Sequence, residues 1–347
     1  MDSESLSRRG FLGVAGGALI CTIGGQKFKV QSEADLKKLN SAIPVPPKVA
    51  AAKGNAALTK AAVSGTRREY WIKAERRRWN PIPRRFDQMM NKRLKKIGKT
   101  AVDVYAYRAY TPGFGQPLGP ATVPGPLIEG NIGDSIVVNF RNECPVPVTM
   151  HPHGVFYSNE MDGAYKGKYT DPGGFVQRGR TVTYVWECVE GTQGTWLYHD
   201  HGPLDPIPLY KGLFGPMVIR DPDEPLPDRE FFLGFHSFIP GAQFPTLKQA
   251  FYAINGRAYT GNTPTMRAKV GDDVAMHVYG VDNDFHTFHV HGHRWTEPGG
   301  NVVDNKTFGP GDSFRVRFIE DNPGKWLYHC HVFSHLHQGM SGWYIVD

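Results

Sequence analysis

The stretch Trp326-Leu327-Tyr328-His329-Cys330-His331 decides the fold, because the chain contains a second version of it, Trp196-Leu197-Tyr198-His199-Asp200-His201. A further pair of matching stretches runs from Val148 to Gly154 and from His286 to Gly292, at an offset of 138 residues. A unit of about 110 to 130 residues that occurs twice in one chain predicts two domains of the same architecture.

Both units have the composition of β-structure. Short runs of β-branched and aromatic residues, such as Ser135 to Phe140 and Thr181 to Trp186, alternate with turns rich in Gly, Pro, Asn and Asp. The stretch Pro222 to Pro227 has the composition of a linker. We therefore predict an all-β protein with two Greek-key β-sandwich domains, domain 1 over residues 66–222 and domain 2 over residues 223–347.

Histidines in the repeated stretches fall into two sets. The two imidazoles of a His-x-His pair lie on one face of a strand, about 6.6 Å apart. His286 lies three residues before His289, an odd step, so we expect it to face the opposite way, as Cys330 does. One predicted set is a mononuclear metal site of His286, Cys330, His335 and Met340. The other consists of four His-x-His pairs, namely His151, His153, His199, His201, His289, His291, His329 and His331.

The donor types indicate copper in both sets. One thiolate, two imidazoles and a thioether are typical of a blue-copper electron-transfer site. Eight further imidazoles are too many for one copper and suit a cluster of three, which predicts four copper ions per chain. A lone His-x-His pair is usually an ordinary structural feature, but packing alone hardly explains four. Domain 1 has Val148 and Asp200 where domain 2 has His286 and Cys330, so it cannot hold a blue copper.

The four histidines outside these sets have blander interpretations. His236 and His277 lie in apolar, strand-like runs, where a structural imidazole is expected. His293 and His337 lie close to predicted ligands, and they fit a supporting role or an ordinary surface position equally well.

These motifs resemble those of the two-domain multicopper oxidases, the group that includes small bacterial laccases. The resemblance covers residue 66 to the C-terminus. It extends to Val123–Glu129, Asp304-Asn305-Lys306 with Gly309-Pro310, and Asp321–Gly324, while His151–Tyr157 and Gly212–Pro216 are similar to ceruloplasmin. It implies cupredoxin-like domains that oxidise a donor one electron at a time at type 1 copper and reduce dioxygen to water at a trinuclear cluster. By the same resemblance, His151 and His289 would hold type 2 copper. The type 3 pair would be held by His153, His199, His201, His291, His329 and His331.

Two further residues are candidates for proton delivery. Asp162 and Tyr157 resemble the acid and the tyrosine found near such clusters, although Asp162-Gly163 is equally a turn signal. Ser334 stands where some relatives carry an acidic residue, so the proton route can differ here.

Other functions and donors stay open at this point. A copper nitrite reductase also has two such domains, but Val148, Asp200 and the eight paired histidines argue against it. A non-enzymatic electron or copper carrier would not need the cluster. Phenolic compounds, ferrous ion and cuprous ion all fit as electron donors.

The N-terminal part predicts export. Ser7-Arg8-Arg9-Gly10-Phe11-Leu12 and the Gly- and Ala-rich apolar stretch after it read as a twin-arginine signal within residues 1–30, followed by a linker at residues 31–65. We expect a periplasmic or extracellular protein. The run Arg67 to Lys99 is strongly basic. No recognition fold accompanies it, which argues against a nucleic-acid partner and favours contact with an acidic surface.

The division of the ligands predicts the assembly. Each domain supplies four cluster histidines, and the resemblance to ceruloplasmin's six-domain ring implies a homotrimer with three clusters, each shared between neighbouring chains. Cys144 and Cys188 are candidates for a disulfide, with free buried thiols as the alternative.

Overall fold

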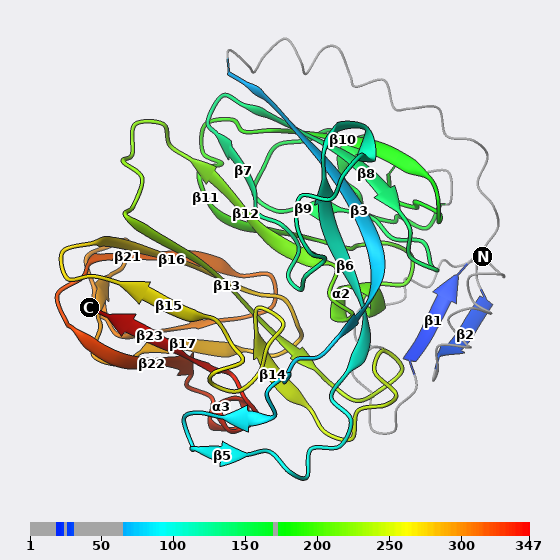
Figure 1. Cartoon of the computed structure of the whole chain (residues 1–347). Coiled ribbons are helices and arrows are strands. Elements are labelled where there is room, and N and C mark those ends of the chain that lie inside the picture. Colours follow the sequence, from blue (N-terminus) through cyan, green and yellow to red (C-terminus); the bar gives the residue numbers. More distant parts are fainter. Residues whose placement is uncertain (1–18, 24–25, 31–64, 169–172) are drawn as a thin grey trace, which may run out of the picture.

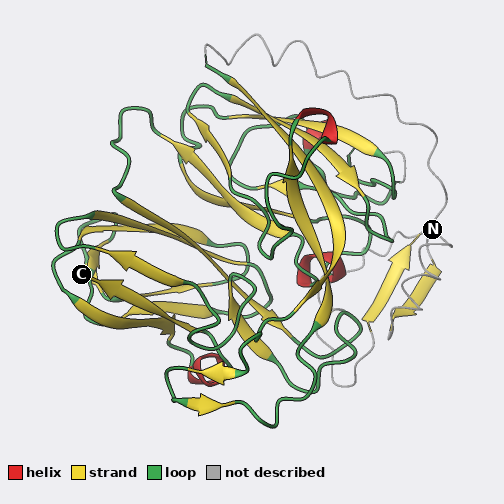
Figure 2. Ribbon diagram, in the orientation of Figure 1, coloured by secondary structure: helices red, strands yellow, loops and turns green. Residues whose placement is uncertain are grey.

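The computed structural model describes residues 19–23, 26–30, 65–168 and 173–347 (Figure 1). Strands dominate this part of the chain and its helices are short, so the predicted all-β class is confirmed (Figure 2). Most of the predicted export signal and linker lies outside the described residues; the described part of it is the hairpin of β1 (Leu19–Ile23) and β2 (Gln26–Val30). No helix among the described residues is long and apolar enough to cross a membrane.

The first half of the chain forms two four-stranded sheets that enclose a core. Alternate residues of β8, among them Ile136, Val138 and Phe140, are fully buried in this core together with Tyr198 and Met217 from the facing sheet. One sheet has the order β10-β8-β3-β6 and the other β7-β12-β11-β9. The strands are β3 (Arg67–Trp79), β6 (Val102–Tyr110), β7 (Ile128–Asn131), β8 (Ser135–Asn142), β9 (His151–Pro152), β10 (Thr181–Glu187), β11 (Gly194–His199) and β12 (Phe214–Arg220).

The second half forms a similar sandwich of a four-stranded and a five-stranded sheet. Leu233, Met276 and Val316 of one sheet pack in a common core with Phe288 and Cys330 of the other. The sheet orders are β14-β13-β16-β21 and β15-β23-β22-β17-β20. The strands are β13 (Arg229–Phe238), β14 (Phe251–Ile254), β15 (Thr265–Ala268), β16 (Asp273–Gly280), β17 (His286–Val290), β20 (Asn305–Phe308), β21 (Ser313–Ile319), β22 (Gly324–Cys330) and β23 (Ser341–Val346).

Short elements complete the two sandwiches, which we call domain 1 and domain 2. Residues between Arg220 and Arg229 connect them. Two minor hairpins and four short helices are β4 (Phe86–Asp87) with β5 (Lys92–Arg93), β18 (Trp295–Thr296) with β19 (Val302–Val303), η2 (Pro112–Phe114), η3 (Asn159–Met161), α2 (Ile207–Tyr210) and α3 (Phe333–His337).

An apolar cluster and a polar network join the two domains. Leu197 and Phe214 of domain 1 pack with Phe251 and Tyr279 of domain 2. Beside them, the Thr195 hydroxyl contacts Nδ1 of His277 at 2.6 Å, and Nε2 of His277 donates to Glu230 at 2.9 Å. Arg220 of domain 1 donates two hydrogen bonds of 2.8 Å to the same Glu230 carboxylate. His277 therefore has the structural role that its apolar surroundings predict.

The segment Pro81–Lys99 lies on domain 2, although it precedes most of domain 1 in the chain. Ile82 and Ile97 belong to the apolar cluster that contains Phe251 and Tyr259. The Ala258 N–H donates to the Pro81 carbonyl at 3.0 Å. Burial of apolar side chains thus attaches this segment to domain 2. The predicted boundaries had placed it in domain 1, over residues 66–222. Cys144 and Cys188 are free and buried, so the disulfide alternative is not realised.

Candidate metal centres

A buried cluster in domain 2 brings together His286, Cys330 and His335. Their ligand atoms lie within 4.8 Å of one another. Nδ1 of His286 lies 3.8 Å and Nδ1 of His335 lies 3.6 Å from the Cys330 sulfur. His286 begins β17 and Cys330 ends β22, two strands that pair directly, and His335 comes from α3. Two imidazoles and one thiol therefore point into one small space.

The thiol of Cys330 is prepared for metal binding. Burial opposes its ionisation, but hydrogen bonds from His286 and His335 outweigh burial and lower its pKa to about 6. The Thr287 backbone N–H also approaches the sulfur at 3.4 Å. At neutral pH the site thus favours a thiolate, the form that binds metal.

His286 is oriented by a carboxylate. Its Nε2 donates to Oδ1 of the buried Asp282 at 3.0 Å, which leaves Nδ1 directed at Cys330. Burial lowers the pKa of His286, but Asp282 and Cys330 outweigh that effect and raise it to about 9. An imidazole whose second nitrogen donates to a carboxylate is typical of metal-ligating histidines.

His335 and Met340 complete this group. The ring of Tyr252 stacks on His335 with the ring centres 3.8 Å apart, and the Tyr252 hydroxyl donates to Asp284 at 2.8 Å. Met340 is fully buried in the same core, and its backbone N–H donates to the His335 carbonyl at 3.0 Å. All four residues of the predicted mononuclear set thus belong to one buried region.

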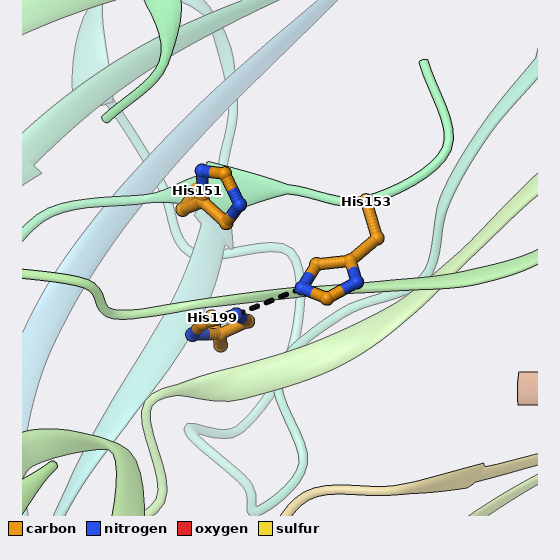
Figure 3. Close-up of side chains that lie close together, drawn as sticks. All are labelled: His151, His153 and His199. Carbon is orange, nitrogen blue, oxygen red and sulfur yellow. Dashed lines mark hydrogen bonds between the residues drawn. The ribbon is translucent and has the colours of Figure 1, made fainter. Parts of the chain in front are cut away.

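A second group forms in domain 1 from the two His-x-His pairs. His151, His153 and His199 have ligand atoms within 4.8 Å of one another, and Nε2 of His153 lies 2.9 Å from Nε2 of His199 (Figure 3). Nδ1 of His151 contacts the Asp162 carbonyl at 2.7 Å, and Nδ1 of His199 contacts the Asp200 carbonyl at 2.8 Å. The Nε2 atoms are therefore the ones left to bind a metal. The ring of His201 lies 5.7 Å from that of His199, on the rim of the group.

Domain 2 repeats this arrangement. His289, His291 and His329 form the third candidate group, and Nε2 of His291 lies 3.1 Å from Nε2 of His329. Nδ1 of His289 contacts the Asp304 carbonyl at 2.7 Å, and Nδ1 of His329 contacts the Cys330 carbonyl at 2.8 Å. The His331 ring lies 5.5 Å from the His329 ring. The internal repeat in the sequence is therefore also a repeat in ligand geometry. We call these two groups the domain 1 and domain 2 half-sites.

Three imidazoles of the half-sites, His153, His199 and His329, are held neutral. Burial, with repulsion from neighbouring histidines, lowers the pKa of His153 to about 4 and that of His199 to about 3. Burial also lowers the pKa of His329 to about 4, against the effect of its hydrogen bond to the Cys330 carbonyl. Neutral imidazole is the form that coordinates metal, so both half-sites are ready to bind at neutral pH.

Strand β17 and the end of β22 separate the mononuclear group from the domain 2 half-site. On β17, His286, Phe288 and Val290 are buried, whereas His289 is turned toward the other face. The Cys330 side chain lies in the domain core, and its neighbours His329 and His331 contact His289 on the opposite face. One residue's backbone therefore connects the thiol to each of the two half-site histidines.

The two half-sites lie apart within the chain. Among the described residues, no ring contact and no candidate metal group includes histidines from both domains. The edge of the domain 1 half-site instead faces the Pro310-Gly311 turn of domain 2, where a side chain at Gly311 would meet the His153 ring at 3.6 Å. One chain by itself thus presents two incomplete sets of imidazoles.

Asp162 and Tyr157 both border the domain 1 half-site. An Asp162 carboxylate oxygen lies 3.1 Å from Nδ1 of His151, and Lys166 pairs with the other oxygen at 2.8 Å. Burial opposes ionisation of Asp162, but Lys166 and His151 hold its pKa below the usual range. The Tyr157 ring lies 6.1 Å from that of His151, and burial and Asp162 raise the Tyr157 pKa to about 12. Asp162 is also the C-cap residue that directly follows η3, so its place in the turn and its contact with His151 coexist.

Domain 1 has no counterpart of the mononuclear group at the equivalent positions. Val148 is fully buried in the domain core. Asp200, at the Cys330 position, is buried too and accepts hydrogen bonds from the backbone N–H groups of Thr149 at 2.7 Å and Gly202 at 3.3 Å. Burial raises the pKa of Asp200 to about 8. A structural carboxyl group thus replaces the thiol.

The sequence assigned no role to several residues that hold these groups, although Asp304 belongs to one of the motifs that resemble the family. Asp282, Asp304, Tyr252 and Asp205 contact His286, His289, His335 and His201 respectively; the last pair is 3.2 Å apart. The backbone carbonyl of Asp304 matches that of Asp162, but the two residues are not separated by the repeat offset of 138, so the repeat could not reveal this equivalence. Only Asp282 and Asp205, each four residues from its histidine, carried a local signal.

His293 and His236 have structural partners. Nε2 of His293 contacts the buried Glu320 carboxylate at 2.9 Å, and its Nδ1 donates to the His291 carbonyl at 2.7 Å. Nε2 of His236 accepts a hydrogen bond of 2.9 Å from the Gly256 backbone N–H. His293 therefore supports a half-site residue, whereas His236 has the structural role expected of it.

Comparison with known proteins decides the family. Residues 120–224 and residues 235–347 match two domain families that are both described as multicopper oxidase. The chain belongs to the multicopper oxidase family. It is accordingly an oxidoreductase by family, and the soft sulfur and imidazole donors of the mononuclear group fit copper.

Curated relatives include both microbial and animal proteins. A probable nitrite reductase-hydroxylamine oxidoreductase fusion protein of Kuenenia stuttgartiensis is 32% identical over 250 residues, which are 65% of this multicopper oxidase and 28% of that protein. Human ceruloplasmin is 29% identical over 262 residues, or 64% of this chain and 23% of that protein. Human ferroxidase HEPHL1 is 29% identical over 271 residues, with 64% and 23% covered. The chain thus spans about a quarter of the length of these relatives.

Solved structures show the same fold. A blue copper oxidase from Nitrosomonas europaea superposes with a TM-score of 0.63 and 23% identity, over 81% of this chain and 86% of that one. A copper nitrite reductase from the same organism superposes with a TM-score of 0.62 and 16% identity, over 81% and 94%. The predicted pair of cupredoxin-like domains is confirmed.

Proposed function

We propose that this multicopper oxidase couples one-electron oxidation of a donor to four-electron reduction of dioxygen to water. The observation that carries the proposal is the arrangement around β22, where Cys330 faces a buried mononuclear group and its neighbours His329 and His331 face a half-site. An electron that enters at the thiolate has a covalent path of one residue to the histidines of the half-site.

The chain's residues divide between two kinds of copper site. In the proposal, His286, Cys330, His335 and Met340 hold type 1 copper. His151 and His289 hold type 2 copper, and the type 3 pair is held by His153, His199, His201, His291, His329 and His331. Copper at these positions would supply one-electron redox chemistry, and four ions together match the four electrons that dioxygen needs. This gives four copper ions per chain.

The protein's own contribution is to prepare and separate the sites. Asp282 keeps Nδ1 of His286 directed at the metal position, and the backbone carbonyls of Asp162 and Asp304 do the equivalent for His151 and His289. The apolar core around Cys330 excludes water from the electron-entry site. Asp162, close to His151 and held ionised beside Lys166, is the proposed proton donor and acceptor, with Tyr157 as its neighbour.

The separated half-sites support a homotrimer. Because the eight imidazoles are divided four and four and do not meet within the described part of one chain, a complete cluster needs domain 1 of one subunit against domain 2 of another. A repeated head-to-tail contact between two-domain chains closes into a ring. Three subunits would then carry three clusters, each at a subunit boundary.

We propose three classes of electron donor, one of them suggested by the name of a relative. The ferroxidase relative suggests ferrous ion, phenolic or aromatic compounds are the laccase-type alternative, and cuprous ion is a third donor. Nitrite reduction is the competing activity, because one relative is named a probable nitrite reductase fusion protein. The eight half-site imidazoles favour oxygen reduction, since a single type 2 copper would not use them. We also propose export to the periplasm or the cell exterior, on the basis of the N-terminal Arg8-Arg9 motif.

Metal analysis and oxygen uptake test the proposal together. We expect about four copper ions per chain, an intense visible thiolate-to-copper band and oxygen consumption with at least one of hydroquinone, ferrous ion or cuprous ion. Cys330→Ser should lose the visible band and the turnover while keeping about three copper ions. Two copper ions per chain with nitrite turnover would instead establish the reductase.

Light scattering of the copper-loaded protein tests the assembly. A trimer is expected, and mixing two inactive variants, His151→Ala and His289→Ala, should restore part of the activity only if clusters form between subunits. A fully active monomer would refute the intersubunit cluster and leave the other assignments standing.

A further inference from the structure

The segment Pro81–Lys99, which we call the basic segment, has no role in the chemistry proposed so far. It contains seven Lys and Arg residues and a single acidic residue, Asp87. Residues 101–347, in contrast, contain 18 Lys and Arg against 26 Asp and Glu. A strongly positive segment is therefore attached to a negatively charged body.

The charges of the basic segment are available to a partner. Arg76 and Arg77 in β3 form ion pairs with Asp103 and Glu75, so the other basic run of the chain is largely neutralised. Within the described residues, by comparison, no ion pair is formed by six exposed cations of the basic segment: Arg84, Lys92, Arg93, Lys95, Lys96 and Lys99. Holding unpaired like charges together costs electrostatic free energy, which a negatively charged partner would offset.

The basic segment has a defined shape. Arg85 donates to the Gly98 carbonyl at 2.9 Å, which joins the two ends of the segment. The β4–β5 pairing joins Phe86 to Arg93 and Asp87 to Lys92. Buried Asp87 accepts a hydrogen bond of 2.8 Å from the Thr260 hydroxyl. The exposed cations therefore lie on and beside a defined hairpin, so binding a partner would not cost the conformational entropy of ordering this segment.

This hairpin lies at the end of domain 2 that carries the proposed electron-entry site. The Gln88 N–H donates to the Thr260 carbonyl at 3.0 Å. Tyr259, the residue before Thr260, donates through its own backbone N–H to the Gly339 carbonyl at 2.7 Å. Gly339 lies in the turn that follows α3 and directly precedes Met340. Figure 1 accordingly shows β5 and α3 at the same end of the molecule.

We propose that the basic segment and α3 form the docking surface for a one-electron redox protein with an acidic surface. The inference rests on the proposed function, because it uses the Cys330 site as the point of electron entry. In each encounter the partner's reduced centre would give up one electron to the copper ion that His286, Cys330, His335 and Met340 would hold, with no proton transferred. The oxidised partner then dissociates.

The chemistry of the surface fits such a partner. Transient electron-transfer complexes bury little area and depend on charge complementarity to speed up and orient the encounter. Met90 at the tip of the hairpin is 61% exposed, which adds an apolar contact among the cations. A single-stranded nucleic acid would be expected to stack on a series of exposed aromatic rings. The basic segment offers only the half-buried Phe86, and α3 adds Phe333, which is 65% exposed and can also serve as an apolar contact for a protein. Nucleic acid also would not account for the position beside the electron-entry site.

Paired charge reversals in the copper-loaded, full-length protein test the proposal. The variants are Lys92→Glu/Arg93→Glu and Lys95→Glu/Lys96→Glu. The matched control is Arg267→Glu/Lys269→Glu, which reverses two exposed charges at the opposite end of domain 2, where Ala268 of β15 pairs with Val346 of β23. The probe is an acidic c-type cytochrome. Its oxidised form is used in calorimetric binding, and its reduced form in stopped-flow measurement of electron transfer, both at low and at high salt.

The expected result is specific to the hairpin. Each hairpin variant should bind the oxidised cytochrome about tenfold or more weakly at low ionic strength, with a second-order electron-transfer rate lowered by a similar factor. The difference in binding between variants and wild type should largely vanish at about 0.5 M salt, because the attraction between charges then reaches only a few ångströms. The control variant should stay within about twofold of wild type, and oxygen uptake with neutral hydroquinone should be unchanged in all variants.

Several results would overturn the proposal. Equal losses in hairpin and control variants would show a general charge effect. Unchanged cytochrome binding, combined with lost binding of DNA or anionic vesicles, would assign the basic segment to those partners. A change of oligomeric state in light scattering would assign it to contact between copies of this chain. If wild type fails with hydroquinone and lacks the visible band, the proposed function fails instead, and the cytochrome-binding comparison still judges the docking surface separately.

Discussion

Replacing Asp282 with Asn would perturb the electron-entry site without touching a proposed copper ligand. The Asp282 carboxylate accepts a hydrogen bond of 3.0 Å from Nε2 of His286 and is almost fully buried. Asn has nearly the same shape and can still accept this hydrogen bond, but it carries no charge. The substitution therefore isolates the electrostatic part of the interaction.

The expected magnitude follows from that change. A hydrogen bond to a charged group contributes about 1.5–3 kcal/mol, whereas a neutral one contributes about 0.5–1.5 kcal/mol. The difference, about 1–1.5 kcal/mol, corresponds to roughly a tenfold lower affinity for the copper bound by His286 and Cys330. This agrees with the range of about 10- to 100-fold for residues that orient metal-ligating histidines.

Competition with a copper chelator at neutral pH would measure the effect through the visible thiolate-to-copper band. Asp272→Asn is the matched control, because Asp272 is a surface residue that pairs with Arg229 in a turn away from the site. Urea denaturation of the copper-free proteins separates a loss of affinity from a general loss of stability. If Asp282→Asn binds copper as tightly as the control, Asp282 does not orient a ligand, and His286 is held by other contacts.

Three further predictions concern the axial ligand, the joint between the domains and the metal. Met340→Leu should keep the copper and its colour but raise the reduction potential; an unshifted potential would mean that Met340 only fills the core. Burial opposes ionisation of Glu230, but hydrogen bonds from His277 and Arg220 outweigh it and lower its pKa to about 2. The ionised Glu230 side chain therefore stabilises the fold fully above about pH 4.5, and this stabilisation is lost as the pH falls toward 2. Glu230→Gln should lower the free energy of unfolding by up to about 3 kcal/mol at pH 7. In urea denaturation at a series of pH values, the variant should also lose less stability toward acid pH than wild type. Removing copper with a chelator should lower the melting temperature and dissociate the trimer, and a copper-free trimer of unchanged stability would contradict the coupling of metal to assembly.

The candidate ligands could be predicted because they depend on local spacing. A strand turns alternate side chains to opposite faces, so the odd step between His286 and His289 was enough to divide them. The structure places His286 in the domain 2 core and His289 on the other face. The duplicated Trp-Leu-Tyr-His stretches in the same way predicted two similar domains, because a repeated pattern of strands and turns specifies a repeated fold.

Interactions that depend on long-range contacts could not be read from the sequence. Tyr252 stacks on His335 although 82 other residues separate them in the chain, and Asp304 reaches His289 by a different offset from its counterpart Asp162. The sequence allowed a disulfide between Cys144 and Cys188, but the fold keeps both thiols free. Each of these outcomes depends on how loops cross the ends of the sheets, which no periodic pattern encodes.

The sequence by itself identified the candidate copper ligands and determined which face of its strand each paired histidine would occupy. The tertiary structure decided how they are grouped: it separates the two half-sites within one chain and anchors the basic segment beside α3 in domain 2. The physical reason is that strand periodicity acts over neighbouring residues. The placement of one domain or segment against another depends instead on which apolar surfaces, such as Ile82 against Phe251, become buried together.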